Sequence, residues 1–482
     1  MSTVHEATRE ITEIILKAAE RARRETSSEP EPEMTRARLD WPIQCEIGPG
    51  LEGAFACESR IGYVNGSKGW LIYQGYDIFD LCAYSTFEEV CYLLLHGHLP
   101  NRNQLDWFKK RLVSYRHLPV TMRHLMGFPV QELNTMAALR IGVSMMRQQL
   151  SFRDIEAGRP EPAKAISTDE DSIPMEVAPY AEEHAKFEFK RERPARPKEA
   201  RKSQDPGTGL EACYHLISGV ATITAGIKRL RDDHLPIEPD PEMSHAANFL
   251  YMMTGQRPDP VQERLMDVAL ILHADHGMNA STFASMVVAS TLSDIYWAIG
   301  SGIAALSGPL HGGANEQVLH LLNEIGSPEA VEEWFERSRA RKRKIMGFGH
   351  RVYKAYDPRA RVLGPLARFA IRGDKGARRL FRTARTLEQK VIESLGAEKK
   401  IFPNVDFYSG IVYTAMGLAP EMFTPIFAVS RVAGWTARVL EYLGKNRIFR
   451  PRAMYVGGFG KEYVKMSRRS KKRRDSERLH KK

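Results

Sequence analysis

Apolar residues recur at the spacing of helix turns along most of this 482-residue chain. Residues 4–25 are the first such segment, and the pattern predicts an exposed amphipathic helix there. Thr86 and Glu89 have the spacing of a capping box ahead of a second segment, which Gly97 and Pro100 should end. The periodicity resumes at Leu210, and it predicts later helices at 246–254, 260–272, 282–300, 315–324, 328–342, 365–371, 377–395, 409–416 and 424–443.

Two stretches depart from this pattern. Between Ile47 and Tyr76, β-branched and aromatic residues are interspersed with glycines, which predicts short strands and turns. From about 151 to 209 the periodicity disappears among charges and prolines, which is typical of a mobile insertion. Because strands and helices do not alternate regularly, the pattern disfavours a doubly wound sheet. The predicted fold class is mainly α, with a small β element near the N-terminus.

Length and charge add two expectations. A chain of this length is too long for one simple core, so two domains plus tails are expected. The net charge is +11, but residues 467–482 hold nine basic and two acidic side chains and supply +7 of it. Such a run is typical of a disordered tail. It is either a solvated segment without a partner or one that makes weak contacts with nucleic acid or another polyanion.

The cysteines and the N-terminal composition predict a compartment. The five cysteines are scattered and show no CxxC spacing, which is typical of reduced thiols rather than of disulfides or a zinc site. Acidic residues in the first turns argue against a mitochondrial presequence, and no secretory signal pattern is visible. No apolar run reaches the length of about 18 residues that a bilayer requires. We therefore expect a cytoplasmic protein without membrane contact.

The segment from Gly347 to Arg359 carries the most informative chemistry. His350 follows a Gly-Phe-Gly turn, and Arg359 follows Pro358 nine residues later. Imidazole can hydrogen-bond a carbonyl and guanidinium can bind a carboxylate in bidentate fashion, so the pair suits a small organic anion. A loop with a capping histidine and a surface arginine is the alternative.

Two further histidines lie near helix ends. His273 and His276 have a spacing that could supply half of a metal site, but no matching second pair is visible, so no metal is expected. A histidine that binds an anion or a neighbouring group is the other interpretation. His311 lies in a glycine-rich turn that opens a helix, where the free N–H groups favour negative charge and lower the pKa of a nearby histidine.

A carboxylate and two arginines complete the candidate chemistry. Asp406 lies among apolar and aromatic residues, where burial would raise its pKa and make it a base, although it could instead cap a helix. Arg431 lies within an apolar helix and Arg450 precedes Pro451, so each either binds an anion or extends to water. Together the candidates indicate acid–base chemistry on a polycarboxylate.

In combination, these motifs resemble the citrate synthase family. The resemblance covers roughly 47–150 and 210–457, and it is carried by 273–279, 308–315, 347–359, 403–410 and 450–452, with 50–53 and 73–76 matching the N-terminal region. It implies an all-helical dimer with a large and a small domain that close over the substrates. It also implies condensation of acetyl-CoA with oxaloacetate, then hydrolysis to citrate and CoA, with no cofactor.

The resemblance also assigns roles to residues of this chain. Asp406 would remove a methyl proton from acetyl-CoA, and His311 would donate a hydrogen bond to the thioester oxygen. His350 would polarise the ketone of oxaloacetate and protonate the alkoxide. The residues implied in oxaloacetate binding are His276, Arg359, Arg431 and Arg450, with Arg450 reaching the partner subunit's site, and those implied near CoA are Asn404 and Lys400.

The expected domain boundaries follow from the same resemblance. The large domain would comprise 41–150, 210–307 and 416–462, and the small domain 308–415. Residues 1–40 would be a helical extension, 151–209 a charged flexible insertion and 463–482 a basic disordered tail.

Three departures and two alternatives accompany the resemblance. Gly277 stands where many members carry Glu, Gln74 replaces a commonly basic residue, and the insertion and the tail lie outside the family pattern. A 2-methylcitrate synthase that uses propionyl-CoA is the closest alternative, because one methylene changes selectivity by only about 1–3 kcal/mol. A non-catalytic nucleic-acid-binding or scaffold protein that acts through the tail is the alternative from another class.

Overall fold

The structure is a computed structural model that describes residues 2–26, 41–147, 209–372 and 375–459, together with 463, 465 and 466. The predicted insertion at 151–209 lies outside the described residues apart from Gly209, and so does the tail at 467–482. By internal contacts the chain divides into Met1–Arg447 and Ile448–Lys482. The division into a large and a small domain stays a prediction.

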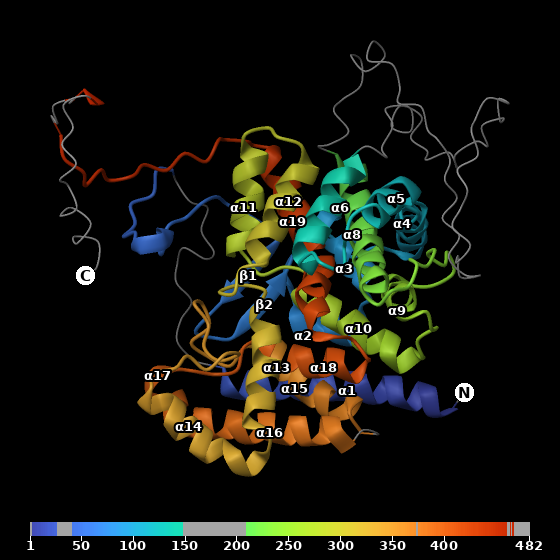
Figure 1. Ribbon diagram of the computed structural model, residues 1–482, viewed down its shortest axis with the longest axis vertical. Coiled ribbons are helices and arrows are strands. Elements are labelled where there is room, and N and C mark those ends of the chain that lie inside the picture. Colours follow the sequence, from blue (N-terminus) through green and yellow to red (C-terminus); the bar gives the residue numbers. More distant parts are fainter. Residues whose placement is uncertain are drawn as a thin grey trace. The chain divides into compact units, whose positions relative to one another are not determined.

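The described residues form a mainly helical fold, which confirms the predicted class (Figure 1). The helices of the first half are α1 (Ser2–Glu25), α2 (Ile78–Tyr84), α3 (Phe87–His96), α4 (Arg102–Ser114), α5 (Pro119–Met126), α6 (Thr135–Met146), α8 (Leu210–Arg231), α9 (His245–Thr254) and α10 (Pro260–His273). The second half contributes α11 (Ala280–Ser290), α12 (Ile295–Leu306), α13 (Ala314–Ile325), α14 (Val331–Ala340), α15 (Pro358–Ala370), α16 (Lys375–Val391), α17 (Ala397–Lys399), α18 (Val405–Ala415) and α19 (Phe423–Leu443).

The predicted β element is a three-stranded antiparallel sheet in the order β1 (Gly62–Asn65), β2 (Trp70–Tyr73) and β3 (Tyr76–Asp77). The turn between β1 and β2 forms hydrogen bonds with the 347–359 segment, which carries the candidate anion-binding groups. The carbonyl of Gly66 accepts hydrogen bonds from the N–H groups of Lys354 and Ala355, at 2.9 and 3.2 Å. A Cβ at Gly66 would lie 2.0 Å from the carbonyl oxygen of Val352, so this approach requires glycine.

The core is built around α19, which Figure 1 shows packed among α8, α11 and α12. Residues 423–439 of α19 are all buried, and so are residues 212–227 of α8. Within the described residues, α8 is the one helix that meets the length and composition of a membrane span, contrary to the expectation from apolar runs. Because 89% of its apolar window is buried inside the protein, α8 has the surroundings of a core helix.

The predicted exposed helix at the N-terminus is only half exposed. Ile11 and Ile15 of α1 are fully buried against α2, α10 and α15. Glu10 and Glu25 also form ion pairs with Arg372 and Arg361 of the α15 region. The prediction was wrong about exposure because the apolar stripe of an amphipathic helix finds its partner only in the tertiary structure.

Three predicted helix boundaries were also wrong, and one of them is the start of α18, which lies at Val405 and not at 409. The helix expected at 282–300 is interrupted between α11 and α12, where Leu292 has a φ of 62° and Asp294 caps α12 by accepting from the N–H of Tyr296. The helix expected to begin at Pro365 begins at Pro358, because Asp357 supplies an N-cap and Pro358 occupies the first turn. Arg359 therefore lies on a helix and not on irregular backbone.

Candidate active site

The Gly347–His350 turn is joined by backbone hydrogen bonds to the segment before α18. The N–H of Gly349 donates to the carbonyl of Phe402 and the N–H of Asn404 donates to the carbonyl of Gly347, both at 2.9 Å. Gly347 has a φ of 82°, and a Cβ there would lie 2.7 to 2.8 Å from Val318 and Phe407. These contacts hold the segments of His350 and Asp406 side by side.

The hydrogen bonds of His350 determine which of its nitrogens carries the proton. Its Nδ1 accepts from the N–H groups of Val352 and Tyr353, at 3.0 and 3.1 Å. Burial, followed by the charge of Arg359, lowers the pKa of His350 to about 4. The neutral ring therefore carries its proton on Nε2, which is free to donate to a substrate oxygen.

Arg359 is buried in an ion pair at the start of α15. Its Nε and Nη2 donate to the two oxygens of Asp357, at 3.0 and 2.7 Å. Burial acts to lower the pKa of Arg359, but the Asp357 carboxylate outweighs it and raises that pKa. The guanidinium thus stays charged and is oriented by a residue that the sequence analysis did not select.

His276 lies in the turn after α10. Residues of α19 and of the sheet form hydrogen bonds with this turn. Arg438 of α19 binds Asp275 in bidentate fashion, at 2.6 and 2.7 Å, and both side chains are almost fully buried. Tyr73 of β2 donates to the carbonyl of Asp275 at 2.9 Å. Gly277, with a φ of 60°, completes the turn.

The ring of His276 faces the other candidate groups. Its centroid lies 5.1 Å from that of His350, and its Nε2 lies 3.3 Å from the hydroxyl of Tyr353. Burial, followed by the charges of Arg359 and His350, places the pKa of His276 well below its usual range. A neutral imidazole at this position can orient a substrate by hydrogen bonding.

Arg431 of α19 does not use all of its hydrogen-bond donors within the described residues. Its Nε donates to the carbonyl of His273 at 2.6 Å, and its guanidinium lies 4.7 Å from the ring centre of Phe427. Among the described residues, its buried Nη1 has no hydrogen-bond partner. Burial lowers the pKa of Arg431 to about 10, so the group is still charged near neutral pH. An unpaired buried cation of this kind favours an anionic ligand.

His311 lies in the glycine-rich turn before α13 and contacts the start of α11. Its Nε2 lies 2.8 Å from the hydroxyl of Ser281 and accepts from the N–H of the same residue at 3.4 Å. Burial, followed by Arg431 and Arg359, lowers the pKa of His311 to about 4. An accepting Nε2 leaves the proton on Nδ1, which can donate to a substrate oxygen.

Asp406 is the one carboxylate of the candidate set, and it is not the cap of α18. Asn404 holds that position, because its Oδ1 accepts from the N–H of Asp406 at 3.1 Å. Oδ1 of Asp406 is buried and has no hydrogen-bond partner within the described part of the chain. Burial raises the pKa of Asp406 to about 7, which suits a base that works near neutral pH.

The structure brings together most of the predicted residues but leaves others apart. The charges of Arg359 and Arg431 act on the pKa values of His276, His311 and Asp406, and His350 also acts on those of His276 and His311. Asn404 adjoins them and donates to the carbonyl of Gly349 at 3.0 Å. Lys400 is exposed, with a φ of 52°. Arg450 belongs to the second unit, so its place in the site stays a prediction.

Several supporting residues were not predicted from the sequence. Asp357, Ser281, Asp275, Arg438 and Tyr353 orient the candidate side chains, and only their nearness to the motifs signalled such roles. Across the described ranges, no group of three His, Cys, Asp or Glu side chains could hold a metal ion. The five cysteines form no disulfide.

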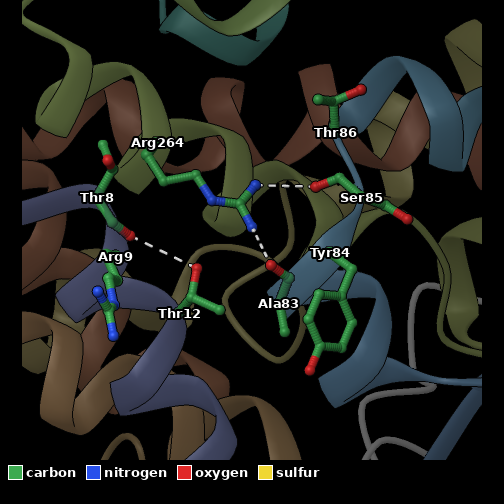
Figure 2. A pocket seen from close by; sticks show the side chains of 8 residues that line it. All are labelled: Thr8, Arg9, Thr12, Ala83, Tyr84, Ser85, Thr86 and Arg264. Carbon is green, nitrogen blue, oxygen red and sulfur yellow. Dashed lines mark hydrogen bonds between the residues drawn. The ribbon is translucent and has the colours of Figure 1, made fainter. Parts of the chain in front are cut away.

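A separate pocket of about 370 Å³ lies between α1 and the end of α2 (Figure 2). Thr8, Arg9 and Thr12 line one side, Tyr84 lies opposite, and Arg264 extends between the two sides. Arg264 already donates to the carbonyls of Ser85 and Ala83 and to Asp267. The pocket shares no residue with the histidine site, and we assign no ligand to it.

The fold and the site define a mainly helical enzyme in which acid–base groups lie near buried arginines that suit a small anion. The family profile described as "Citrate synthase, C-terminal domain" matches residues 50–452. A citrate synthase from Acidithiobacillus ferridurans is 39% identical over 431 residues, which cover 88% of this chain and 99% of the relative. A citrate/2-methylcitrate synthase from Bacillus subtilis is 33% identical over 410 residues, which cover 85% and 96%.

Solved structures agree with the sequence comparisons. A ternary complex of carboxymethyl coenzyme A and oxaloacetate with citrate synthase from Thermoplasma acidophilum superposes with a TM-score of 0.74. It is 31% identical and covers 88% of this chain and 100% of its own. The chain therefore belongs to the citrate synthase family, whose members are acyltransferase-type condensing enzymes.

Proposed function

We propose that this chain condenses acetyl-CoA with oxaloacetate and hydrolyses the resulting thioester to citrate and CoA. The observation that carries the proposal is the buried, unpartnered Oδ1 of Asp406 among the described side chains, in a group whose pKa is raised to about 7. A thioester methyl group is a weak acid, and its deprotonation requires a base that is not already occupied by hydrogen bonds.

The first step forms the carbon nucleophile. Asp406 takes a proton from the methyl group of acetyl-CoA, and negative charge develops on the thioester oxygen. Nδ1–H of His311 donates a hydrogen bond to that oxygen, because Nε2 faces Ser281. A neutral imidazole held in place before the reaction stabilises the enolate without reorganisation of the site.

The second step joins the two substrates. The enolate carbon attacks the ketone carbon of oxaloacetate, whose oxygen accepts from Nε2–H of His350. The new alkoxide then takes that proton, and the proton that Asp406 took from acetyl-CoA returns through water to His350 before the next turnover. Arg359, held by Asp357, and Nη1 of Arg431 bind the carboxylates of oxaloacetate, and His276 orients the substrate. Water finally cleaves the thioester and releases CoA, so the atoms balance without a cofactor.

Assembly and location are part of the same proposal. A homodimer in which Arg450 enters the partner subunit's site would supply a third arginine for oxaloacetate. Asn404 and Lys400 would contact CoA. We propose that the enzyme works in the cytoplasm, in the tricarboxylic acid cycle, and that residues 467–482 make only weak contacts with polyanions.

Initial rates with acetyl-CoA and propionyl-CoA test the proposed substrate. With saturating oxaloacetate and detection of the released CoA thiol, kcat/KM should favour acetyl-CoA by about tenfold or more, the effect of one methylene in a fitted pocket. A preference for propionyl-CoA would identify a 2-methylcitrate synthase. Absence of turnover, with salt-sensitive nucleic-acid binding that is lost on truncation after Met466, would support the non-catalytic alternative.

A further inference from the structure

A buried carboxylate outside the site connects its two halves. Glu388 of α16 is 3% exposed and accepts hydrogen bonds from two phenols: Tyr356 donates to Oε1 and Tyr408 donates to Oε2. Arg385, one turn earlier on α16, donates to Oε2 of Glu388 and also lies 3.4 Å from the hydroxyl of Tyr408. Both carboxylate oxygens are thus committed to side chains from other elements.

The two phenols come from different parts of the site. Tyr356 lies on the segment between His350 and Arg359, which faces oxaloacetate in the proposed function. Tyr408 lies on α18, two residues after the base Asp406. No hydrogen bond joins Tyr356 directly to Tyr408 in the described residues, so Glu388 is the link between them.

Packing holds each phenol against this carboxylate. The guanidinium of Arg361 lies 4.5 Å from the ring centre of Tyr356, and Arg361 in turn pairs with Glu25 of α1. The ring of Tyr408 lies 3.1 to 3.4 Å from the position that a Cβ would occupy at Gly364 of α15. Burial, followed by the charge of Glu388, raises the pKa of both phenols far above the physiological range, so both remain donors.

We infer that Glu388 is a positioning residue that couples the oxaloacetate side of the site to the acetyl-CoA side, an inference that rests on the proposed function. A carboxylate that accepts from two phenols holds them more strongly than a neutral acceptor would. Because displacement of a reacting group by about 1 Å can cost a hundredfold in rate, loss of this link should reduce activity without loss of a group that contacts substrate.

Three variants test the Tyr356–Glu388 and Tyr408–Glu388 hydrogen bonds separately. Tyr356→Phe should raise the oxaloacetate KM and Kd by about tenfold at nearly unchanged kcat, because only the binding side loosens. Tyr408→Phe should lower kcat by about tenfold at unchanged oxaloacetate Kd, because only the base shifts. Glu388→Gln should show both effects, and either tyrosine substitution added to Glu388→Gln should change little further. Steady-state kinetics, calorimetric oxaloacetate binding and thermal unfolding supply the measurements.

Glu332→Gln is the matched control, since Glu332 of α14 is exposed and pairs with Lys390 of α16, the helix that carries Glu388. This substitution should leave all parameters unchanged. The inference is overturned if each tyrosine variant changes kcat and Kd together, or if Glu388→Gln only lowers the melting temperature. Wild-type protein without turnover overturns the proposed function and this inference with it. If the wild-type protein turns over but the two tyrosine variants do not show separate effects on kcat and on the oxaloacetate Kd, only this inference is overturned.

Discussion

Burial sets the protonation state of the ionisable groups in the site, in opposite directions for acids and bases. It lowers the pKa of His311 and His350 to about 4, so both rings are neutral donors at neutral pH. It raises the pKa of Asp406 to about 7, so the carboxylate can both take and release a proton. Desolvation disfavours the charged form of each group, and the arginines add to this effect for the histidines.

Asp406→Asn should abolish most turnover while it preserves substrate binding. The amide has nearly the shape of the carboxylate but cannot accept the methyl proton, so kcat should fall about a thousandfold. The calorimetric Kd for oxaloacetate should stay within about twofold, because the arginines and His276 are untouched. Asp232→Asn, at the exposed end of α8, is the matched control and should behave as wild type.

The pH profile gives an independent check on this assignment. Asp406 must be ionised to act, so kcat/KM for acetyl-CoA should fall as the pH drops below about 7, by tenfold per unit. The residual activity of Asp406→Asn should lack this acid limb. Near-normal turnover in that variant, or an unchanged limb, would mean that another group is the base.

At the level of elements, the N-terminus of α18 does two things at once. Asn404 caps the helix through Oδ1 and fixes the Gly347–His350 turn through Nδ2. A local signal, Asn two residues before Asp, thus secures a contact between segments 55 residues apart in sequence. The cap of α18 is therefore part of the site and not only of the helix.

Asn404→Ala should therefore cost more activity than its loss of stability implies. Removal of an N-cap costs about 1 kcal/mol, and the same cost is expected for Asn101→Ala at the exposed start of α4. Only Asn404→Ala should also lower kcat/KM, by about tenfold or more, because the His350 turn loses its anchor. Thermal unfolding and steady-state kinetics of both variants decide this, and equal losses of activity would contradict it.

Helix boundaries were predictable where the signals are local. The capping box of Thr86 and Glu89 and the end of α3 at Gly97 are as predicted, because each depends on residues within one turn. The interruption after α11 could not be predicted from the hydrophobic periodicity, because apolar residues continue through it. It is fixed by Asp294, which also pairs with Arg147 of another segment. The predicted start of α15 lies seven residues too late, because proline is typical of a helix start whereas Pro365 is tolerated inside this helix.

At the scale of the whole molecule, the proposed dimer makes each site depend on two chains. Co-expression of Asp406→Asn with Arg450→Ala chains should restore activity that neither variant has alone. In a mixed dimer, the site with an intact Asp406 receives Arg450 from its partner. Random pairing of equal amounts should therefore give about a quarter of the wild-type sites. Turnover of co-purified, differently tagged chains measures this.

An inactive mixture of mixed dimers would show that Arg450 acts within its own chain. Purified dimers of one kind are the control, and each should remain inactive. Because the reciprocal site in a mixed dimer lacks both groups, activity well above a quarter would also contradict the assignment.

Periodicity, caps and residue chemistry are local properties, so the helical class, the short sheet and the candidate side chains could be predicted from the sequence. How those side chains are held, charged and paired depends on the tertiary structure. It put Asp357 on Arg359, Arg438 on Asp275 and Ser281 on His311, and it left Nη1 of Arg431 and Oδ1 of Asp406 unpartnered among the described residues. Burial, pKa and the distance between segments depend on how the whole chain packs, and no linear pattern contains them.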